Sequence, residues 1–196
     1  MLGSLPVEFY DRDAALIARQ LLGMVLVAES EDGRCVGRII ETEAYLPCGD
    51  PANHAHRGRT NSNAAMFGPP GSAYVYSIHA RFCLNAVTGA EGVPSAVLIR
   101  AVEPLEGIEL MKARRGRVEI KDLASGPAKL CEAFRIDRRF NAVNLVCGDR
   151  LWLSAPKVNI PIEIEVTPRI GVTAGQKRLL RFVIRAHPLA SRPSRS

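Results

Sequence analysis

Two carboxylates and an aromatic ring share one face of a predicted strand near the start of the chain. The stretch runs from Arg38 to Tyr45, and the alternation of side chains along a strand places Glu41, Glu43 and Tyr45 on the same side. Side chains two residues apart on a strand are separated by about 7 Å. This spacing suits a site where a flat ligand stacks on the ring while a carboxylate faces the reacting atom beside it. The alternative is a half-solvated strand whose acidic side chains point to water, as such side chains usually do.

Two further segments carry groups that can take part in the same chemistry. Arg100 lies near the end of an apolar run over 95–102, and a buried guanidinium requires an anionic or carbonyl partner, for which Glu43 is a candidate. The loop over 46–71 is unusually long and is rich in Pro, Gly and Asn. It is either a mobile basic loop or a ligand-facing one, and its position directly after the strand favours the second. Its histidines and arginines are His54, His56, Arg57 and Arg59.

Several common catalytic motifs are absent from the sequence, and their absence argues against some classes of reaction. No G-x-S-x-G, H-E-x-x-H, Walker or G-x-G-x-x-G pattern occurs, which argues against acyl transfer, zinc hydrolysis, nucleotide hydrolysis and dinucleotide chemistry. His54 and His56 have no cysteine spacing to match, so no metal site is expected. A carboxylate with aromatic neighbours and an arginine suits hydrolysis at a sugar carbon, with a planar leaving group held by stacking. A nucleobase that has left the DNA duplex fits that description.

Composition indicates one globular domain with a bias toward anionic partners. The 196 residues are 47% hydrophobic and 23% charged, the net charge is +6, and 21 of the 26 basic residues are arginine. Arginine binds phosphate in a bidentate way, so this excess is compatible with nucleic-acid binding, although genome composition produces the same bias. Five cysteines without a C-x-x-C pair indicate reduced thiols in a cytosolic protein. We expect neither a signal peptide nor a membrane span.

The elements that position these residues follow from apolar patterns and turn residues. Asp11 is expected to cap a first helix that stops at Gly23, and Ser125 to cap another with Pro127 just inside its start. The predicted helical segments cover 12–22, 105–113 and 125–134. The predicted strands cover 24–29, 35–45, 72–78, 82–87, 95–102, 151–153, 162–166 and 181–185, with a tight turn over 168–172.

The predicted organisation is a single domain over 1–186 followed by a flexible basic tail over 187–196. Two places in the domain are candidate phosphate contacts. One is the helix start near Lys129, although many such helix starts bind nothing. The other is a basic cluster that otherwise simply favours a helix C-terminus, namely Arg114, Arg115 and Arg117.

Eight blocks of the sequence, taken together, resemble one protein family. In chain order they are Ile-Glu-Thr-Glu-Ala-Tyr45, His54, Met-Phe-Gly68 with Gly71, Tyr-Val-Tyr76, Cys-Leu-Asn85, Leu-Ile-Arg100-Ala-Val-Glu-Pro-Leu-Glu-Gly107, Ser-Gly-Pro-Ala-Lys-Leu-Cys131 and Pro-Arg-Ile-Gly-Val172. Their order resembles that of the 3-methyladenine (alkyladenine) DNA glycosylases of the mammalian type. The blocks fall within residues 7–186, nearly the whole chain.

The resemblance implies a fold and an activity. The fold is of the α+β class, a single domain with a curved, mostly antiparallel β-sheet flanked by helices and a protruding β-hairpin, like the C-terminal domain of formyltransferases. The activity is that of a monofunctional glycosylase of base excision repair, which flips an alkylated or deaminated purine out of duplex DNA and hydrolyses its N-glycosidic bond. No cofactor and no metal are implied. We expect a cytoplasmic, nucleoid-associated monomer whose partner is double-stranded DNA containing damaged purines.

The same resemblance gives roles to individual residues. Glu43 matches the general base that deprotonates the attacking water, and Arg100 and the backbone carbonyl of Ile170 match groups that hold this water. Asn85 matches the residue that rejects the 2-amino group of guanine. The walls of the base pocket match Tyr45, His54 and Tyr76. A 3- or 7-alkylated purine is cationic, so it stacks well between electron-rich rings.

The sequence departs from the family at the tip of the predicted hairpin. The family usually has a tyrosine there, which intercalates where the base has left the duplex. The matching position is His79, and the tip is one residue shorter than usual. Imidazole is smaller and can be charged, so it is expected to fill the gap less well.

Two other functions remain compatible with the sequence. One is a module that binds alkylated or unpaired DNA without cutting it. It differs from an enzyme at Glu43, since Gln there should abolish base release and leave binding nearly intact. The other is an RNA-directed or formyltransferase-like domain with the same strand plan, which predicts no preference for damaged DNA over intact duplex or RNA.

Overall fold

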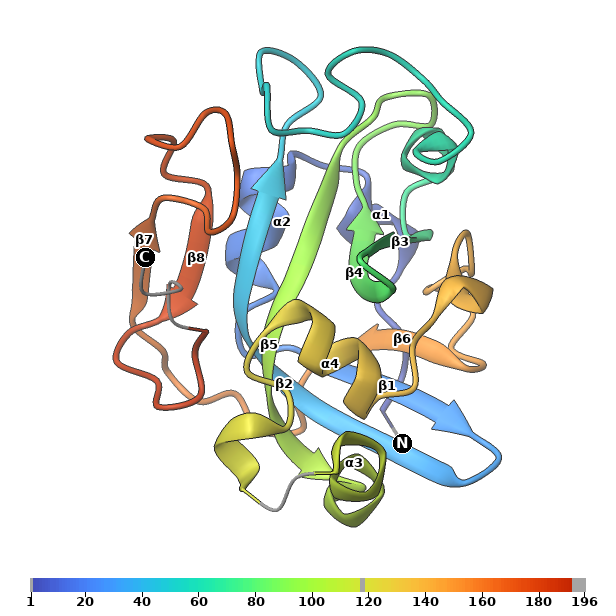
Figure 1. Cartoon of the computed structure of the whole chain (residues 1–196), viewed down its shortest axis with the longest axis vertical. Coiled ribbons are helices and arrows are strands. Elements are labelled where there is room, and N and C mark those ends of the chain that lie inside the picture. The colour runs from blue at the N-terminus through green and yellow to red at the C-terminus, as the bar shows by residue number, and fades with distance from the viewer. Residues whose placement is uncertain (1, 117–118, 192–196) are drawn as a thin grey trace.

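The chain folds around one curled antiparallel sheet, seen in a computed structural model that describes residues 2–116 and 119–191 (Figure 1). The main path of the sheet runs β3-β4-β5-β2-β1-β6, and β8 joins it beside β2 and carries β7 on its outer side. The strands are β1 (Val25–Ser30), β2 (Gly33–Tyr45), β3 (Ala73–Ile78), β4 (Arg81–Val87), β5 (Ala96–Glu106), β6 (Leu151–Ser154), β7 (Ile164–Thr167) and β8 (Arg181–Ile184).

Strand β2 organises the sheet because it has partners along both edges. On one edge β5 pairs with β2 over most of its length, from Val36 to Tyr45. On the other edge β1 pairs with the first half of β2, and β8 with the second half, at Glu41 to Glu43. The register with β5 shifts on either side of Glu41, where β2 changes partner. The two predicted acids therefore lie where β2 is hydrogen-bonded on both sides.

Four α-helices and three 3-10 helices of the described chain pack around the sheet. They are α1 (Val7–Tyr10), α2 (Ala14–Gln20), α3 (Ile108–Arg115), α4 (Pro127–Ala133), η1 (Ala64–Phe67), η2 (Ile120–Asp122) and η3 (Arg138–Phe140). Helix α2 packs on β2 and β5, and α4 packs on β4 and β5 (Figure 1). The main core is formed by apolar side chains such as Ile17, Ile39, Ile99 and Leu130, all fully buried. Thr42 of β2 bonds to the Ala18 carbonyl of α2 at 2.7 Å.

The curled antiparallel sheet of a single α+β domain was the predicted fold, and it is confirmed. Three local predictions are wrong. Asp13, not Asp11, caps the first helix, through a 3.0 Å bond from the Leu16 amide. Strand β5 continues to Glu106, so the helix predicted to start at 105 begins at Ile108.

The third wrong prediction is the cap at Ser125, because α4 begins after Gly126 without a side-chain cap. The Ser125 hydroxyl instead accepts a 3.3 Å hydrogen bond from Lys129, which also bonds to Asp122. The predicted phosphate contact at this helix start thus has its lysine engaged within the protein.

The basic cluster at the end of α3 is also occupied by the protein's own acceptors. Arg114 donates to the Ala133 carbonyl at 3.0 Å and to the Ser30 hydroxyl at 2.9 Å. Arg115 pairs with Glu132. The third member of the cluster, Arg117, lies outside the described residues. The two described arginines therefore hold α3 in place, and neither is left for a phosphate.

The start of the predicted flexible tail is fixed to the domain. The Ser191 amide and hydroxyl donate to the buried Glu41 carboxylate at 2.7 and 2.6 Å. Ser191 is therefore bonded to the sheet, and the domain boundary at 186 stays a prediction. The rest of the predicted tail, 192–196, lies outside the described residues. No described helix has both the length and the apolar character needed to cross a membrane.

Candidate active site

Glu43 of β2 is a fully buried carboxylate held by two hydrogen bonds and an ion pair. One oxygen accepts the Tyr45 hydroxyl at 2.8 Å, and the other accepts the Ile170 amide at 2.8 Å and lies 3.2 Å from Arg100 Nη1. Burial and the neighbouring Glu43 raise the pKa of Tyr45, so the phenol keeps the proton that it donates. The alternative in which the acids of this strand point to water is therefore wrong.

The sheet register brings these groups together from distant parts of the sequence. Glu43 pairs with Leu98 of β5, which places Arg100 of the same strand beside the two acids. Ile170 lies between β7 and β8, and Gly171 adopts a φ of +76°, a conformation that favours glycine. The turn predicted over 168–172 thus directs a backbone amide at Glu43.

Arg100 pairs with Glu43, the anionic partner expected for an arginine in an apolar strand, and it also pairs with Glu41. Its Nε donates to Glu41 at 2.8 Å, so one guanidinium bridges both acids of β2. Arg181 of β8 donates to the same Glu41 oxygen at 2.7 Å. Burial raises the pKa of Glu41, but Arg100, Arg181 and Ser191 outweigh burial and lower it overall. Sequence reasoning found Arg100 but missed Arg181 and Ser191.

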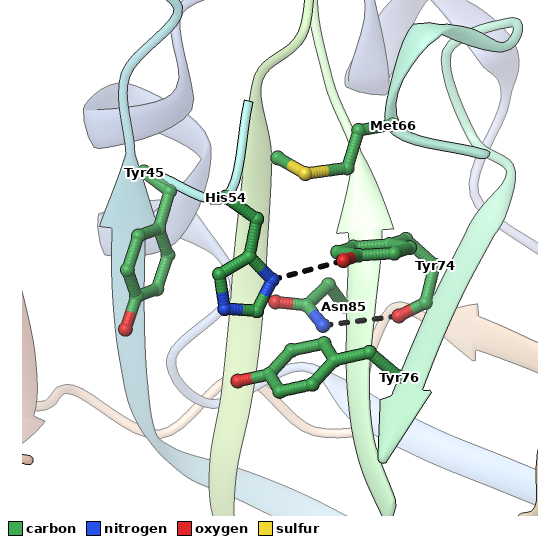
Figure 2. A pocket seen from close by; sticks show the side chains of 6 residues that line it. All are labelled: Tyr45, His54, Met66, Tyr74, Tyr76 and Asn85. Atoms are coloured by element: carbon green, nitrogen blue, oxygen red, sulfur yellow. Dashed lines mark hydrogen bonds between the residues drawn. The ribbon is translucent and has the colours of Figure 1, made fainter. Parts of the chain in front are cut away.

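A narrow aromatic pocket is lined in part by Tyr45, whose hydroxyl bonds to Glu43 (Figure 2). Its space of about 220 Å³ includes open solvent at its mouth, and most of its walls are flat rings, which suit a flat ligand. Tyr45 forms one side, with His54 and Tyr76 on the other (Figure 2). The His54 and Tyr76 rings meet edge to face with centroids 4.4 Å apart. The complete lining consists of Tyr45, His54, Met66, Tyr74, Tyr76 and Asn85.

The pocket lining carries no charge near neutral pH. Burial lowers the pKa of His54, so the imidazole is neutral, and its Nδ1 is 2.9 Å from the Tyr74 hydroxyl. Burial, with a smaller effect of Cys83, raises the pKa of Tyr74 to about 12. The charges near a bound ring would therefore come from residues outside the lining, such as Glu43, which bonds to the Tyr45 hydroxyl.

Asn85 lies on β4 directly across from Tyr74 of β3. Its side-chain amide donates to the Tyr74 carbonyl at 3.0 Å, and the carbonyl end of the amide points the other way (Figure 2). The side chain is buried, so this bond fixes its orientation at the pocket floor. The predicted pocket residues Tyr45, His54, Tyr76 and Asn85 are therefore brought together, and Met66 and Tyr74 are added to them.

His79 lies apart from the pocket, at the tip of the β3–β4 hairpin. It is exposed, and with Ala80 it forms a two-residue turn in which both residues have positive φ, +48° and +61°. Such turns match the twist of a hairpin and usually contain Asn or Gly. Neighbouring Ile78 is 50% exposed. The structure places His79 on a projecting tip, and its role there stays a prediction.

Asp50 and Arg169 are buried beside the site, and sequence reasoning assigned neither. Arg169 forms a bidentate ion pair with Asp50 at 2.6 and 2.7 Å, and its guanidinium carbon is 4.7 Å from the Tyr45 ring centroid. The sequence pointed to Arg169 only through its position next to Ile170 in the predicted turn.

The described residues hold no group of three His, Cys, Asp or Glu side chains arranged to bind a metal ion.

A fixed, buried carboxylate next to an uncharged aromatic pocket is the arrangement of a hydrolase that acts on a bond to a flat ring. The comparisons with known proteins narrow this class. The family model for methylpurine-DNA glycosylases matches residues 8–188. The chain belongs to the methylpurine-DNA glycosylase family and is thus a DNA glycosylase, a hydrolase of DNA repair.

Full-length relatives from bacteria and archaea agree with this assignment. The chain is 43% identical over 189 residues to a protein of Carboxydothermus hydrogenoformans, covering 96% of this chain and 98% of the relative. It is 45% identical over 193 residues to a protein of Methanoculleus marisnigri, covering 96% and 99%. It is 44% identical over 194 residues to a protein of Methanocella arvoryzae, covering 96% of each. The name of each relative includes the words 3-methyladenine DNA glycosylase.

Proposed function

We propose that the chain releases alkylated or deaminated purines of the 3-methyladenine class from duplex DNA. The damaged nucleotide leaves the helix, and its base enters between Tyr45 and the pair formed by His54 and Tyr76. A water molecule attacks C1′ of the sugar, Glu43 takes a proton from this water, and the bond from C1′ to the base nitrogen breaks. The base leaves with the bonding electrons, and an abasic site remains.

The observation that carries the proposal is the position of Glu43. It is fully buried, fixed by two hydrogen bonds and an ion pair, and joined through the Tyr45 hydroxyl to the wall of the pocket. We propose that a base stacked on Tyr45 has its sugar close to this carboxylate. We propose that Arg100 and the Ile170 carbonyl orient the water. A cationic purine is already activated as a leaving group, so the neutral pocket needs no strong acid.

The remaining roles follow from position. We propose that Asn85 excludes the 2-amino group of guanine, because its amide is fixed at the pocket floor. We propose that His79 enters the duplex at the gap left by the extruded base, with Ile78 as apolar support.

The net charge of +6 supports binding to the DNA backbone and association with the nucleoid. We propose that the protein works as a monomer, which sedimentation would show as a species near 21.3 kDa.

Glu43→Gln tests the proposed function. Loss of a general base lowers a rate by about 10²- to 10⁴-fold, so single-turnover release of hypoxanthine from a defined duplex should fall by that factor. Binding to the same duplex should change little. Abasic sites are counted as strand breaks after alkali, and breaks without alkali should not appear if the enzyme is monofunctional.

The matched control is Glu163→Gln, which removes a carboxylate that is 77% exposed. Its rate should equal that of the unaltered protein. The enzyme proposal is wrong if the unaltered protein releases neither hypoxanthine nor methylated purines. The role of Glu43 is wrong if Glu43→Gln releases base as fast as the control.

A further inference from the structure

Arg169 is a buried cation that contacts the base pocket from outside. Its side chain is 0% exposed, and its guanidinium lies over the Tyr45 ring at 4.7 Å from the centroid. Arg169 is not one of the six residues that line the pocket. The ring that a bound base would stack on therefore already carries a cation that does not touch the base.

Asp50 holds this cation in place. Its two carboxylate oxygens accept Nη1 and Nη2 of Arg169 at 2.7 and 2.6 Å, and Nη1 also donates to the Ala44 carbonyl at 3.0 Å. Asp50 is itself fixed by the Leu46 amide at 3.0 Å. Burial lowers the pKa of Arg169, but the hydrogen bonds and charge of Asp50 raise it overall, so the guanidinium stays charged.

The two charges of this pair act in opposite directions on a base in the pocket. An aromatic ring attracts a cation through the negative charge of its face. A guanidinium over the ring uses part of that attraction and repels a second cation nearby. A carboxylate bound to the guanidinium offsets part of this repulsion. A neutral base is affected much less by either charge, because it carries no net charge of its own.

We propose that the Arg169–Asp50 pair sets the preference of the pocket between cationic and neutral purines. The pair acts through Tyr45, so both residues are positioning and specificity-determining groups and neither touches the base. Arg169 limits the advantage that a cationic purine gains from stacking, and Asp50 restores part of it. The inference rests on the proposed function, because it concerns damaged bases bound against Tyr45.

The test compares two bases at the same position of the same duplex, cationic 7-methyladenine and neutral hypoxanthine, neither of which has a 2-amino group. The measured quantity is the ratio of their single-turnover release rates. Arg169→Gln should raise this ratio about three- to tenfold, the size of one cation–π contact. Asp50→Asn should lower the ratio by a similar factor, since it leaves the guanidinium without its counter-charge.

The double variant Asp50→Asn with Arg169→Gln should return the ratio to near that of the unaltered protein. It also leaves no buried charge unpaired, so its folding shows whether a single variant that fails to fold does so because of its unpaired charge. The matched control is Arg178→Gln, because Arg178 is 4.0 Å from Asp50, is 41% exposed and does not contact the Tyr45 ring. Its ratio should stay within about twofold of the unaltered protein, as expected for a surface charge.

The proposal is overturned if Arg169→Gln and Asp50→Asn move the ratio in the same direction, or if each slows both bases by one common factor. A purely structural role predicts the common factor. Equilibrium Kd values for the two duplexes measure the preference at the binding step, independently of base release. Failure of the proposed function, in which neither base is released, is therefore separate from failure of this inference.

Discussion

Replacing Glu41 with Gln tests whether the buried charges beneath the site hold the sheet together. The carboxylate is fully buried and accepts Arg100 and Arg181 at 2.8 and 2.7 Å, in addition to two bonds from Ser191. Gln keeps the shape but removes the charge and turns a donor toward the guanidiniums. Breaking a buried ion pair costs about 3–5 kcal/mol. For a chain of this length, the expected fall in Tm is roughly 6–20 °C.

Thermal unfolding measures this loss against Glu163→Gln, whose exposed pair with Arg185 should contribute less than about 1 kcal/mol. The pH dependence gives a second measurement. Because the pKa of Glu41 is lower in the folded chain, its contribution is complete above the unfolded carboxyl pKa of about 4.3. It is lost as the pH falls through the folded pKa, so the difference between the unaltered protein and Glu41→Gln should narrow in acid. Equal costs for the two substitutions at pH 7 would refute this reasoning.

Two further predictions concern the pocket and the hairpin tip. Burial lowers the pKa of His54, so the imidazole becomes protonated only at a pH below its ordinary pKa of about 6.5. In acid, the charged imidazole should slow the release of cationic 7-methyladenine more than that of neutral hypoxanthine. His54→Gln should remove this pH dependence of the rate ratio, and a ratio that changes with pH equally in both proteins would contradict it. Ala80→Gly should raise stability by about 1 kcal/mol because Ala80 has a φ of +61°, which is measured as a Tm increase of roughly 2–4 °C. An unchanged or lower Tm would show that the turn is not strained.

The sequence predicted two kinds of feature in the site. One is set by the alternation of side chains along a strand, and the other by the need of a buried charge for a partner. Alternation along one strand placed Glu43 and Tyr45 on one face, and their 2.8 Å contact agrees with that. An arginine inside an apolar strand needed an anionic partner, and Arg100 has two. Strand positions were predictable for the same reason, because apolar alternation is a property of a few neighbouring residues.

The parts that the sequence did not predict depend on contacts between distant segments. Asp50 and Arg169 are separated by 119 positions, and each looks like an ordinary loop residue in its own surroundings. Ser191 was placed in a flexible tail because its neighbours are Pro, Ser and Arg, yet it is held by a carboxylate 150 positions earlier. The helix cap was predicted at Asp11 but is Asp13, because aspartate is a good cap at either position. Only the packing of α2 on the sheet selects between the two residues.

The charges buried around the site balance as a group. Among residues 2–116 and 119–191, the buried charged side chains are three acids and three arginines, Glu41, Glu43, Asp50, Arg100, Arg169 and Arg181. An unbalanced charge in this interior would cost several kcal/mol, so the buried Glu43 carboxylate is tolerated only because an arginine accompanies it. It also follows that single substitutions in this set should be costlier than paired ones that remove an acid and an arginine together. Because the six charges sum to zero, a purine bound in the pocket would be affected mainly by local differences of charge, such as the guanidinium of Arg169 over Tyr45.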